Sequence, residues 1–315
     1  MRHTAWEGAI FPGVAELTKK AGRGENATMS GPRIWLSTVI FFPVFAFLIL
    51  FALYPALGMA LSSFVDGNHL TLNNYAGALA GQYLSSFIQT GLLSIESGLI
   101  GVVGGAFVAW SLSRIQIGWV SRTLGAIASV MANFAGLPLA VAFMATMGTS
   151  GFVTLFFQTI SGKSLMDMGF NLASESGLIV VYATFLVPLA VILLSPAVHS
   201  IRYEWEEAAY TLGGSTWTYV RSVVIPILLP SLVGTFALLF ANAFSSYVTA
   251  YAIAGGTVNL IPLQIGYLIN GNVSMNLGLG DALAMLEIIV LGVSVAVFLL
   301  MQKRGTKWQG GSSRG

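Results

Sequence analysis

The chain has 315 residues, of which 56% are hydrophobic and 8% are charged, and its formal net charge is +2. Because soluble domains carry about 25% charged residues, this composition excludes an ordinary soluble domain and indicates a helical membrane protein. The sequence contains no cysteine, which excludes a disulfide framework, a thiolate metal site and a cysteine nucleophile. His3, His69 and His199 lack metal-ligand spacing, so neither a metal nor another cofactor is expected.

Six long apolar segments predict six membrane-spanning helices, since about 20 apolar residues cross a bilayer and lipid offers no partners to an irregular backbone. The predicted spans are residues 34–64, 86–112, 125–147, 177–198, 226–252 and 279–301. Residues 1–33 and 302–315 are the expected tails of a 34–301 transmembrane domain. Pro43 and Pro55 should kink the first span.

Small residues gather in the second predicted span. Gly101 and Gly105 lie four residues apart on one helix face, which allows another helix to approach closely. We expect this face to pack within the chain, and a dimer face is the alternative.

Lysine and arginine are distributed unevenly between the segments that connect the spans. With the N-terminus inside, only Lys163 falls on the outer side. The inner side holds Arg2, Lys19, Lys20, Arg23, Arg33, Arg114, Arg122, Arg202, Arg221, Lys303, Arg304, Lys307 and Arg314. Because cytoplasmic loops carry an excess of these residues, both termini and the 199–225 loop are expected in the cytoplasm.

Residues 199–225 form a polar island between apolar runs. Its charged residues are Arg202, Glu204, Glu206, Glu207 and Arg221. Residues 200–212 are good helix formers, Gly213 accepts the left-handed conformation that ends a helix, and Ser215 can cap a second helix. The sequence predicts a short helix, a turn and another helix that runs toward Pro226.

The same loop contains a motif with fixed spacing. Glu207-Ala208-Ala209 is followed after three residues by Gly213, and after nine more by Val223-Val224-Ile225-Pro226. The pattern resembles the EAA loop in the permease subunits of type I ATP-binding-cassette (ABC) importers, although Val223 and Ile225 stand where that family usually has Ile and Leu. The alternative is an ordinary amphipathic helix at the membrane interface.

The resemblance implies an all-α permease fold with the EAA loop between the fourth and fifth of six spans. It also implies two cytoplasmic ATPase subunits, a second permease that is identical or homologous, and an extracytoplasmic substrate-binding protein; nucleic acid is not expected. The chain is then a transport subunit and not an enzyme, with residues 204–212 as the coupling helix. The residues assigned to ATPase coupling are Glu204, Glu207, Ala208, Ala209, Gly213 and Pro226.

Polar residues inside the spans indicate a route for solute. Asn242, Ser245, Ser246 and Thr249 follow the spacing of one helical face in the fifth predicted span, and such a face should turn away from lipid. Glu96 and Glu287 are the two intramembrane carboxylates. Helix–helix packing for the hydroxyls and a structural, protonated state for the glutamates are the alternatives.

The transported solute, or cargo, is the property that the sequence determines least. Residues 241–252 and 259–265 are loosely similar to the polyamine, opine and phosphonate group of these permeases. The expected outer carboxylates are Asp66, Asp167, Glu175 and Asp281. They favour a cation such as spermidine or putrescine, unless they serve only to dock the binding protein. Phosphonate, iron, sugar and amino acids remain alternative cargoes.

Two other protein classes have weaker support. A secondary transporter typically shows an internal repeat, and none is visible. Gly278-Leu279-Gly280-Asp281 resembles an intramembrane aspartyl protease motif, but that chemistry needs a second carboxylate sharing a proton, and Asp66 and Asp167 fall in outer loops. Ser161-Gly162-Lys163-Ser164 has Phe157 where a phosphate-binding loop needs glycine.

Overall fold

The computed structural model describes residues 42–67, 69–115, 117–270 and 276–309, with side chains as far as residue 305. The predicted N-terminal tail, residues 1–33, lies outside this range. The chain divides into two units, Met1–Gly58 and Met59–Gly315, which are described separately.

In the first unit the described residues are helical, as part of a candidate span over Phe42–Ser62. A π-turn, η1 (Ile49–Leu53), leads into α3 (Tyr54–Ser62). The N–H of Tyr54 donates to the carbonyl of Ile49, directly before Pro55. Because proline lacks an N–H and crowds the carbonyl four residues earlier, a widened turn relieves that crowding.

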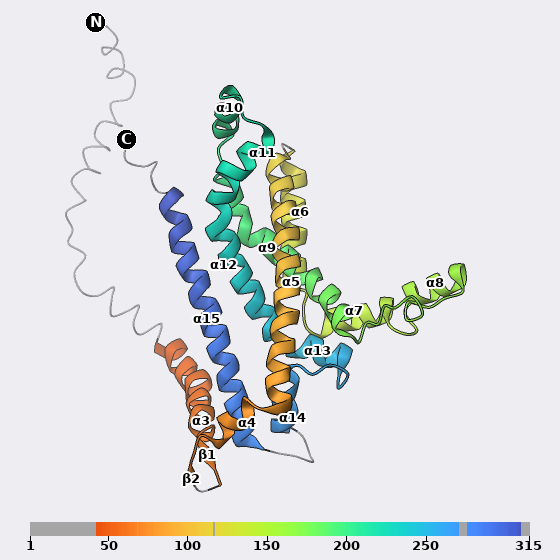
Figure 1. The fold of residues 1–315 in the computed structure, drawn as a ribbon, viewed down its shortest axis with the longest axis vertical. Coiled ribbons are helices and arrows are strands. Elements are labelled where there is room, and N and C mark those ends of the chain that lie inside the picture. The colour runs from red at the N-terminus through yellow and green to blue at the C-terminus, as the bar shows by residue number, and fades with distance from the viewer. Residues whose placement is uncertain (1–41, 68, 116, 271–275, 310–315) are drawn as a thin grey trace, which may run out of the picture. The chain divides into compact units, whose positions relative to one another are not determined.

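Four long helices form the bundle of the second unit (Figure 1). They are α5 (Gly81–Arg114), α9 (Glu175–His199), α12 (Ile225–Phe244) and α15 (Leu277–Gln309). α5, α9 and α12 contact one another, and α15 packs along α12. The fully buried Leu186 and Leu239 lie in the core between them.

The small-residue face of α5 packs closely against α9 and α12. A Cβ on Gly101 would lie 2.9 Å from Leu239 Cδ1 and 3.0 Å from Leu186 Cβ, and one on Gly105 would lie 2.3 Å from Ala190 Cβ. The predicted packing of this face within the chain is therefore confirmed.

The six-span, all-α class is also confirmed. The candidate spans are Phe42–Ser62, Gly81–Arg114, Leu137–Ser161, Glu175–His199, Thr216–Phe244 and Leu277–Gly305. Together with the apolar composition, these helices indicate a multi-pass membrane protein.

The predicted third span, an uninterrupted helix over 125–147, is wrong. The chain instead forms α6 (Gly118–Asn133), α7 (Leu137–Met147) and α8 (Phe152–Ser161). Gly136 has a φ of 74° before α7, a conformation that glycine adopts without a Cβ penalty. Pro138 then occupies the first turn of α7, where a missing N–H costs nothing.

The predicted fifth span, 226–252, is wrong at its second half. α12 ends at Phe244, and α13 (Tyr247–Ala254) begins after a break at Ser245 and Ser246. α14 (Ile261–Asn270) follows.

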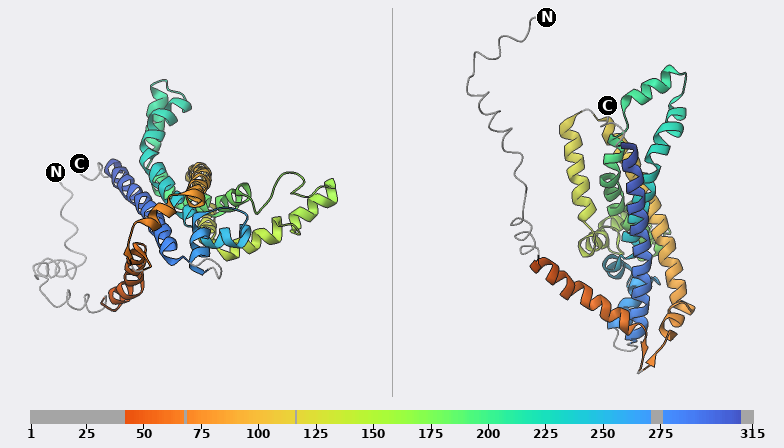
Figure 2. Two further views of the ribbon diagram at one scale, coloured as in Figure 1. Left: turned by 60° about the horizontal axis from the view of Figure 1, so that its bottom comes forward. Right: turned by 90° about the vertical axis from the view of Figure 1, so that its left-hand side faces the viewer.

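A small cap lies at the end of the bundle that carries α14, opposite to α10 (Figures 1 and 2). Strands β1 (Val65–Asp66) and β2 (His69–Leu70) pair antiparallel, and α4 (Asn73–Ala78) follows. The Nδ2 of Asn74 donates to the carbonyls of Ser63 at 3.0 Å and Val65 at 2.9 Å. The Ser62 hydroxyl donates to the buried carboxylate of Asp281 at the start of α15.

Candidate coupling loop and solute path

The polar loop folds as its local sequence predicts. α10 spans Tyr203–Thr211. Gly213 follows the helix with a φ of 78°, and the N–H of Gly214 donates to the carbonyl of Ala209 at 2.9 Å. The Ser215 hydroxyl accepts from the N–H of Thr218 at 3.2 Å and so caps α11 (Thr216–Tyr219). The predicted helix, glycine turn and capped second helix are confirmed, and they lie at one end of the bundle (Figure 1).

α10 presents its acidic residues outward. Glu204 and Glu207 are exposed, whereas Ala209 is partly buried and packs against the hydrophobic core. Large apolar side chains are exposed in the same loop, with Leu212 at 88% and Trp217 at 66% of their full accessibility. A surface that combines exposed acids with exposed aromatic and aliphatic groups is suited to a protein partner.

Glu206 is the exception, because it faces the bundle. Its Oε2 lies 2.7 Å from Nη2 of Arg114, the last residue of α5, and the two side chains are 14% and 43% exposed. The Arg114 guanidinium also lies over the Trp110 ring, 4.8 Å from its centroid. Sequence reasoning left Glu206 and Arg114 out of the site, since their pairing depends on how two distant helices meet.

The motif ends at a second π-turn. In η2 (Val220–Val224) the N–H of Ile225 donates to the carbonyl of Val220, directly before Pro226. This repeats the arrangement before Pro55, with the same physical reason. The proline of the motif thus marks the widened turn through which α11 continues into α12.

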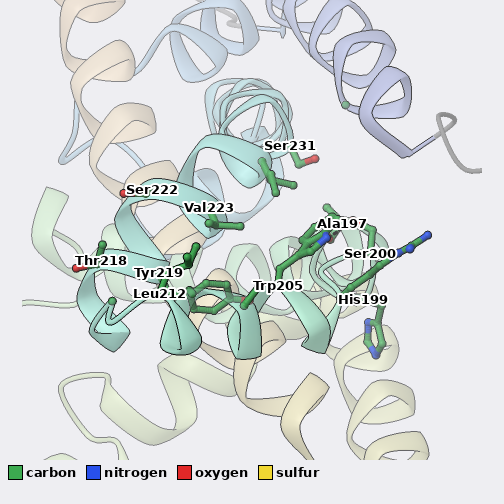
Figure 3. Close-up of a pocket in the computed structure, with 16 residues that line it drawn as sticks. Ala197, His199, Ser200, Trp205, Leu212, Thr218, Tyr219, Ser222, Val223 and Ser231 are labelled. Atoms are coloured by element: carbon green, nitrogen blue, oxygen red, sulfur yellow. Dashed lines mark hydrogen bonds between the residues drawn. The ribbon is translucent and has the colours of Figure 1, made fainter.

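A cavity of about 1090 Å³ separates the loop from the bundle (Figure 3). Its lining comes from the end of α9, from α10, α11 and η2, from the start of α12, and from Gly305 of α15. Trp205, Leu212 and Val223 give it an apolar wall, and His199, Ser222 and Ser231 add polar groups. α10 is therefore not packed solidly onto the bundle along its whole length.

The four predicted path residues do not share one helical face, because the helix breaks between them. Asn242 and Ser245 are exposed, Ser246 is half-buried and Thr249 is buried. The Asn242 amide donates to its own helix at Leu238, 3.1 Å away, and the Ser245 hydroxyl bonds the carbonyl of Ala241 at 3.0 Å. The single-face interpretation is wrong, and Asn242 and Ser245 are the exposed members of the set.

Hydrogen bonds fix the residue before α7 and the break between α12 and α13. The Thr249 hydroxyl accepts from the N–H of Gly136 at 3.2 Å, and the buried Tyr182 hydroxyl donates to the carbonyl of Ser246 at 3.1 Å. Thr249 therefore satisfies a backbone group just before α7, which agrees with the packing alternative for these hydroxyls.

The two intramembrane glutamates have different surroundings. Glu96 is exposed on α5 between the exposed Ile95 and Leu99, whereas Glu287 is half-buried on α15. A carboxylate on a lipid-facing surface is costly, so the Glu96 face of α5 requires protein or water in the membrane.

A polar cluster near the start of α5 holds the segment before α14. Asn259 Oδ1 accepts from the Ser86 hydroxyl and from the Gln264 amide, both at 2.6 Å. The Thr90 hydroxyl accepts from the N–H of Ile261 at 2.9 Å. These contacts give a packing role to the stretch 259–265, which carried the looser resemblance.

Known proteins of similar sequence were found for this chain. No protein-family model matches the chain. It is 27% identical over 227 residues to a putative ferric transport system permease protein of Haemophilus influenzae, covering 70% of this chain and 34% of that protein. It is 25% identical over 130 residues to a spermidine/putrescine transport system permease protein of Shigella flexneri, covering 41% and 48%. The chain thus spans about a third of the length of the ferric relative.

Comparison of folds gives solved structures that resemble the chain. A crystallised bacterial ABC transporter that imports the acidic polysaccharide alginate superimposes with a TM-score of 0.62 at 15% identity, covering 93% of this chain and 99% of that one.

Proposed function

We propose that this chain, whose sequence relatives are ABC permease subunits and whose fold is that of an ABC importer permease, forms part of the membrane channel of an ATP-driven importer. In this proposal its own residues provide the solute path and the contact to the ATPase. ATP is hydrolysed in separate cytoplasmic subunits. Movement between inward-open and outward-open states requires that ATP and the loaded binding protein each favour one state.

The observation that carries the proposal is the outward face of α10. Glu204 and Glu207 are exposed there, beside the exposed Leu212. Glu204 and Glu207 are three residues apart and share a helix face, which suits a groove that offers basic or amide groups. The distribution of lysine and arginine supports a cytoplasmic position for this face, where an ATPase can reach it.

The second permease is proposed to cover the Glu96 face of α5. This face exposes apolar residues around a carboxylate, so it suits neither lipid nor open water alone. A second permease, identical or homologous, would enclose a path between the two subunits. Asn242, Ser245, Ser246 and Glu287 are the further candidates for contact with the solute.

We propose a polyamine-like cation as cargo, received from an extracytoplasmic binding protein. The exposed carboxylates of Asp66, Asp167 and Glu175 support this, and the backbone N–H and hydroxyl of Ser164 hold the pKa of Asp167 below its usual value, so it stays charged. Asp281 does not contribute, because it is buried against Ser62. One of the relatives is named for spermidine and putrescine transport.

The orientation is tested by single cysteines, since the natural chain has none. Ser161→Cys should react with an impermeant thiol reagent in intact cells, and Ser215→Cys only after lysis, because the membrane shields the cytoplasmic side. Both serines are exposed, so accessibility within the fold is matched. Equal labelling of the two in intact cells would contradict the proposed orientation.

The cargo is tested with the purified complex, its ATPase and its binding protein in proteoliposomes. Spermidine or putrescine should raise the melting temperature of the binding protein and stimulate ATP hydrolysis by the complex, because a ligand stabilises the state that it binds. Ferric ion, alginate oligosaccharide and phosphonate serve as comparison ligands. Stimulation by one of those, with none by polyamines, refutes a polyamine cargo and leaves the importer function intact.

A further inference from the structure

The contact between Glu206 and Arg114 joins two parts of the chain that lie 92 residues apart. It belongs to a short series of polar contacts that continues along the loop. The Tyr210 hydroxyl donates to the other carboxylate oxygen of Glu206 at 3.4 Å and lies 2.9 Å from the Thr216 hydroxyl. The series therefore links the end of α5 to α10 and to the first residue of α11.

The surroundings of the Arg114–Glu206 pair indicate that it fixes the position of α10 and adds little to stability. A cavity of about 160 Å³ lies beside it, lined by Trp110, Arg114, Glu206 and Tyr219, and also by His199 and Arg202. Because Arg114 is 43% exposed, solvent screens the pair, and it contributes little to overall stability. Its geometry is nevertheless specific, since Arg114 is held between the Glu206 carboxylate and the Trp110 ring.

α5 is long enough to carry a displacement across the membrane. Like α9 and α15 it is unbroken, and it runs over 34 residues from Gly81 to Arg114. Glu96 lies near its middle, and Ser86 and Thr90 bind the segment before α14 at its far end. A rigid helix transmits movement along its length, so a shift at Arg114 also shifts these groups.

We propose that the Arg114–Glu206 pair is the link through which movement of α10 reaches α5 and the solute path. This inference rests on the proposed function, because the ATPase supplies the movement. Arg114 and Glu206 are positioning residues: they set where α10 stands relative to α5, while Glu204 and Glu207 face the ATPase.

The experiment uses charge reversal in the complete complex, reconstituted with its ATPase and binding protein. The variants are Arg114→Glu, Glu206→Arg and the double exchange, which restores opposite charges. Each single variant places two side chains of like charge next to each other, beside the cavity that Arg202 also lines. Each should lower the ratio of ATP hydrolysis stimulated by the loaded binding protein to basal ATP hydrolysis. The expected decrease is about fivefold or more, the low end of ordinary coupling between sites. The double variant should recover most of that loss.

Arg122→Glu is the matched control. Arg122 is exposed on α6 and donates to the carbonyl of Gly118 within its own helix, so its reversal changes the net charge by the same amount as Arg114→Glu without touching α10. It should leave the ratio unchanged. Membrane abundance and ATPase co-purification are measured for every variant, because a merely structural role would lower these, whereas the proposed link lowers the stimulation ratio at normal abundance.

The outcomes separate the link from the proposed function. A wild-type complex that shows no ATP-dependent uptake refutes the proposed function and the link together. A working wild-type complex in which both single variants keep their stimulation ratio overturns the link alone, as does a double variant that stays as impaired as the singles while all variants remain abundant.

Discussion

Gly213→Asp is expected to reduce ATP-dependent uptake by about fivefold or more, because about 1 kcal/mol of backbone strain redirects α10. The φ of Gly213 is 78°, and a Cβ there would meet no atom within 4 Å, so the effect comes from the backbone and not from a clash. Glu207→Ala is expected to reduce uptake as well, because it removes an exposed carboxylate from the face proposed to meet the ATPase. Uptake, ATPase co-purification and membrane abundance are the measurements.

Gly162→Asp provides the matched control for the glycine variant. Gly162 has a φ of 70° and likewise an open position for a Cβ, and it ends α8, so the backbone strain is closely similar. It lies outside the loop and should leave uptake near the wild-type level. Full uptake with both Gly213→Asp and Glu207→Ala at normal abundance would refute the coupling-helix assignment.

Gly105→Val is expected to have the largest effect on folding. A Cβ at Gly105 would lie 2.3 Å from Ala190 Cβ and 3.0 Å from the carbonyl oxygen of Val187, so α5 and α9 must move apart. Overpacking of this kind costs about 1–3 kcal/mol or more, and here it also separates the central helices. Membrane abundance and the detergent melting temperature should both fall.

Gly91→Val is the control on the same helix. A Cβ at Gly91 would meet nothing within 4 Å, while the change in residue type and in helix propensity is identical. If Gly91→Val and Gly105→Val lower the melting temperature equally, the close packing of α5 on α9 is not the cause of the loss.

The sequence determined the features that depend on local chemistry. Apolar length fixed six spans, because each must satisfy its backbone within lipid. Gly213 and Ser215 predicted the turn and the cap of the polar loop, since both act through their own backbone neighbours. The break before α7 also had a local signal in Gly136 and Pro138, which the length of the apolar run outweighed in the prediction of the third span.

Only the tertiary structure decided the features that depend on contacts between distant residues. The break at Ser245 and Ser246 contains neither glycine nor proline; it is held by Tyr182 from α9, while Thr249 binds the backbone at Gly136. The choice of Glu206, rather than Glu204 or Glu207, as the partner of α5 follows from where α5 ends. A local sequence records propensity and polarity, but the partner of a buried polar group is set by how the helices pack, and that packing exists only in the folded chain.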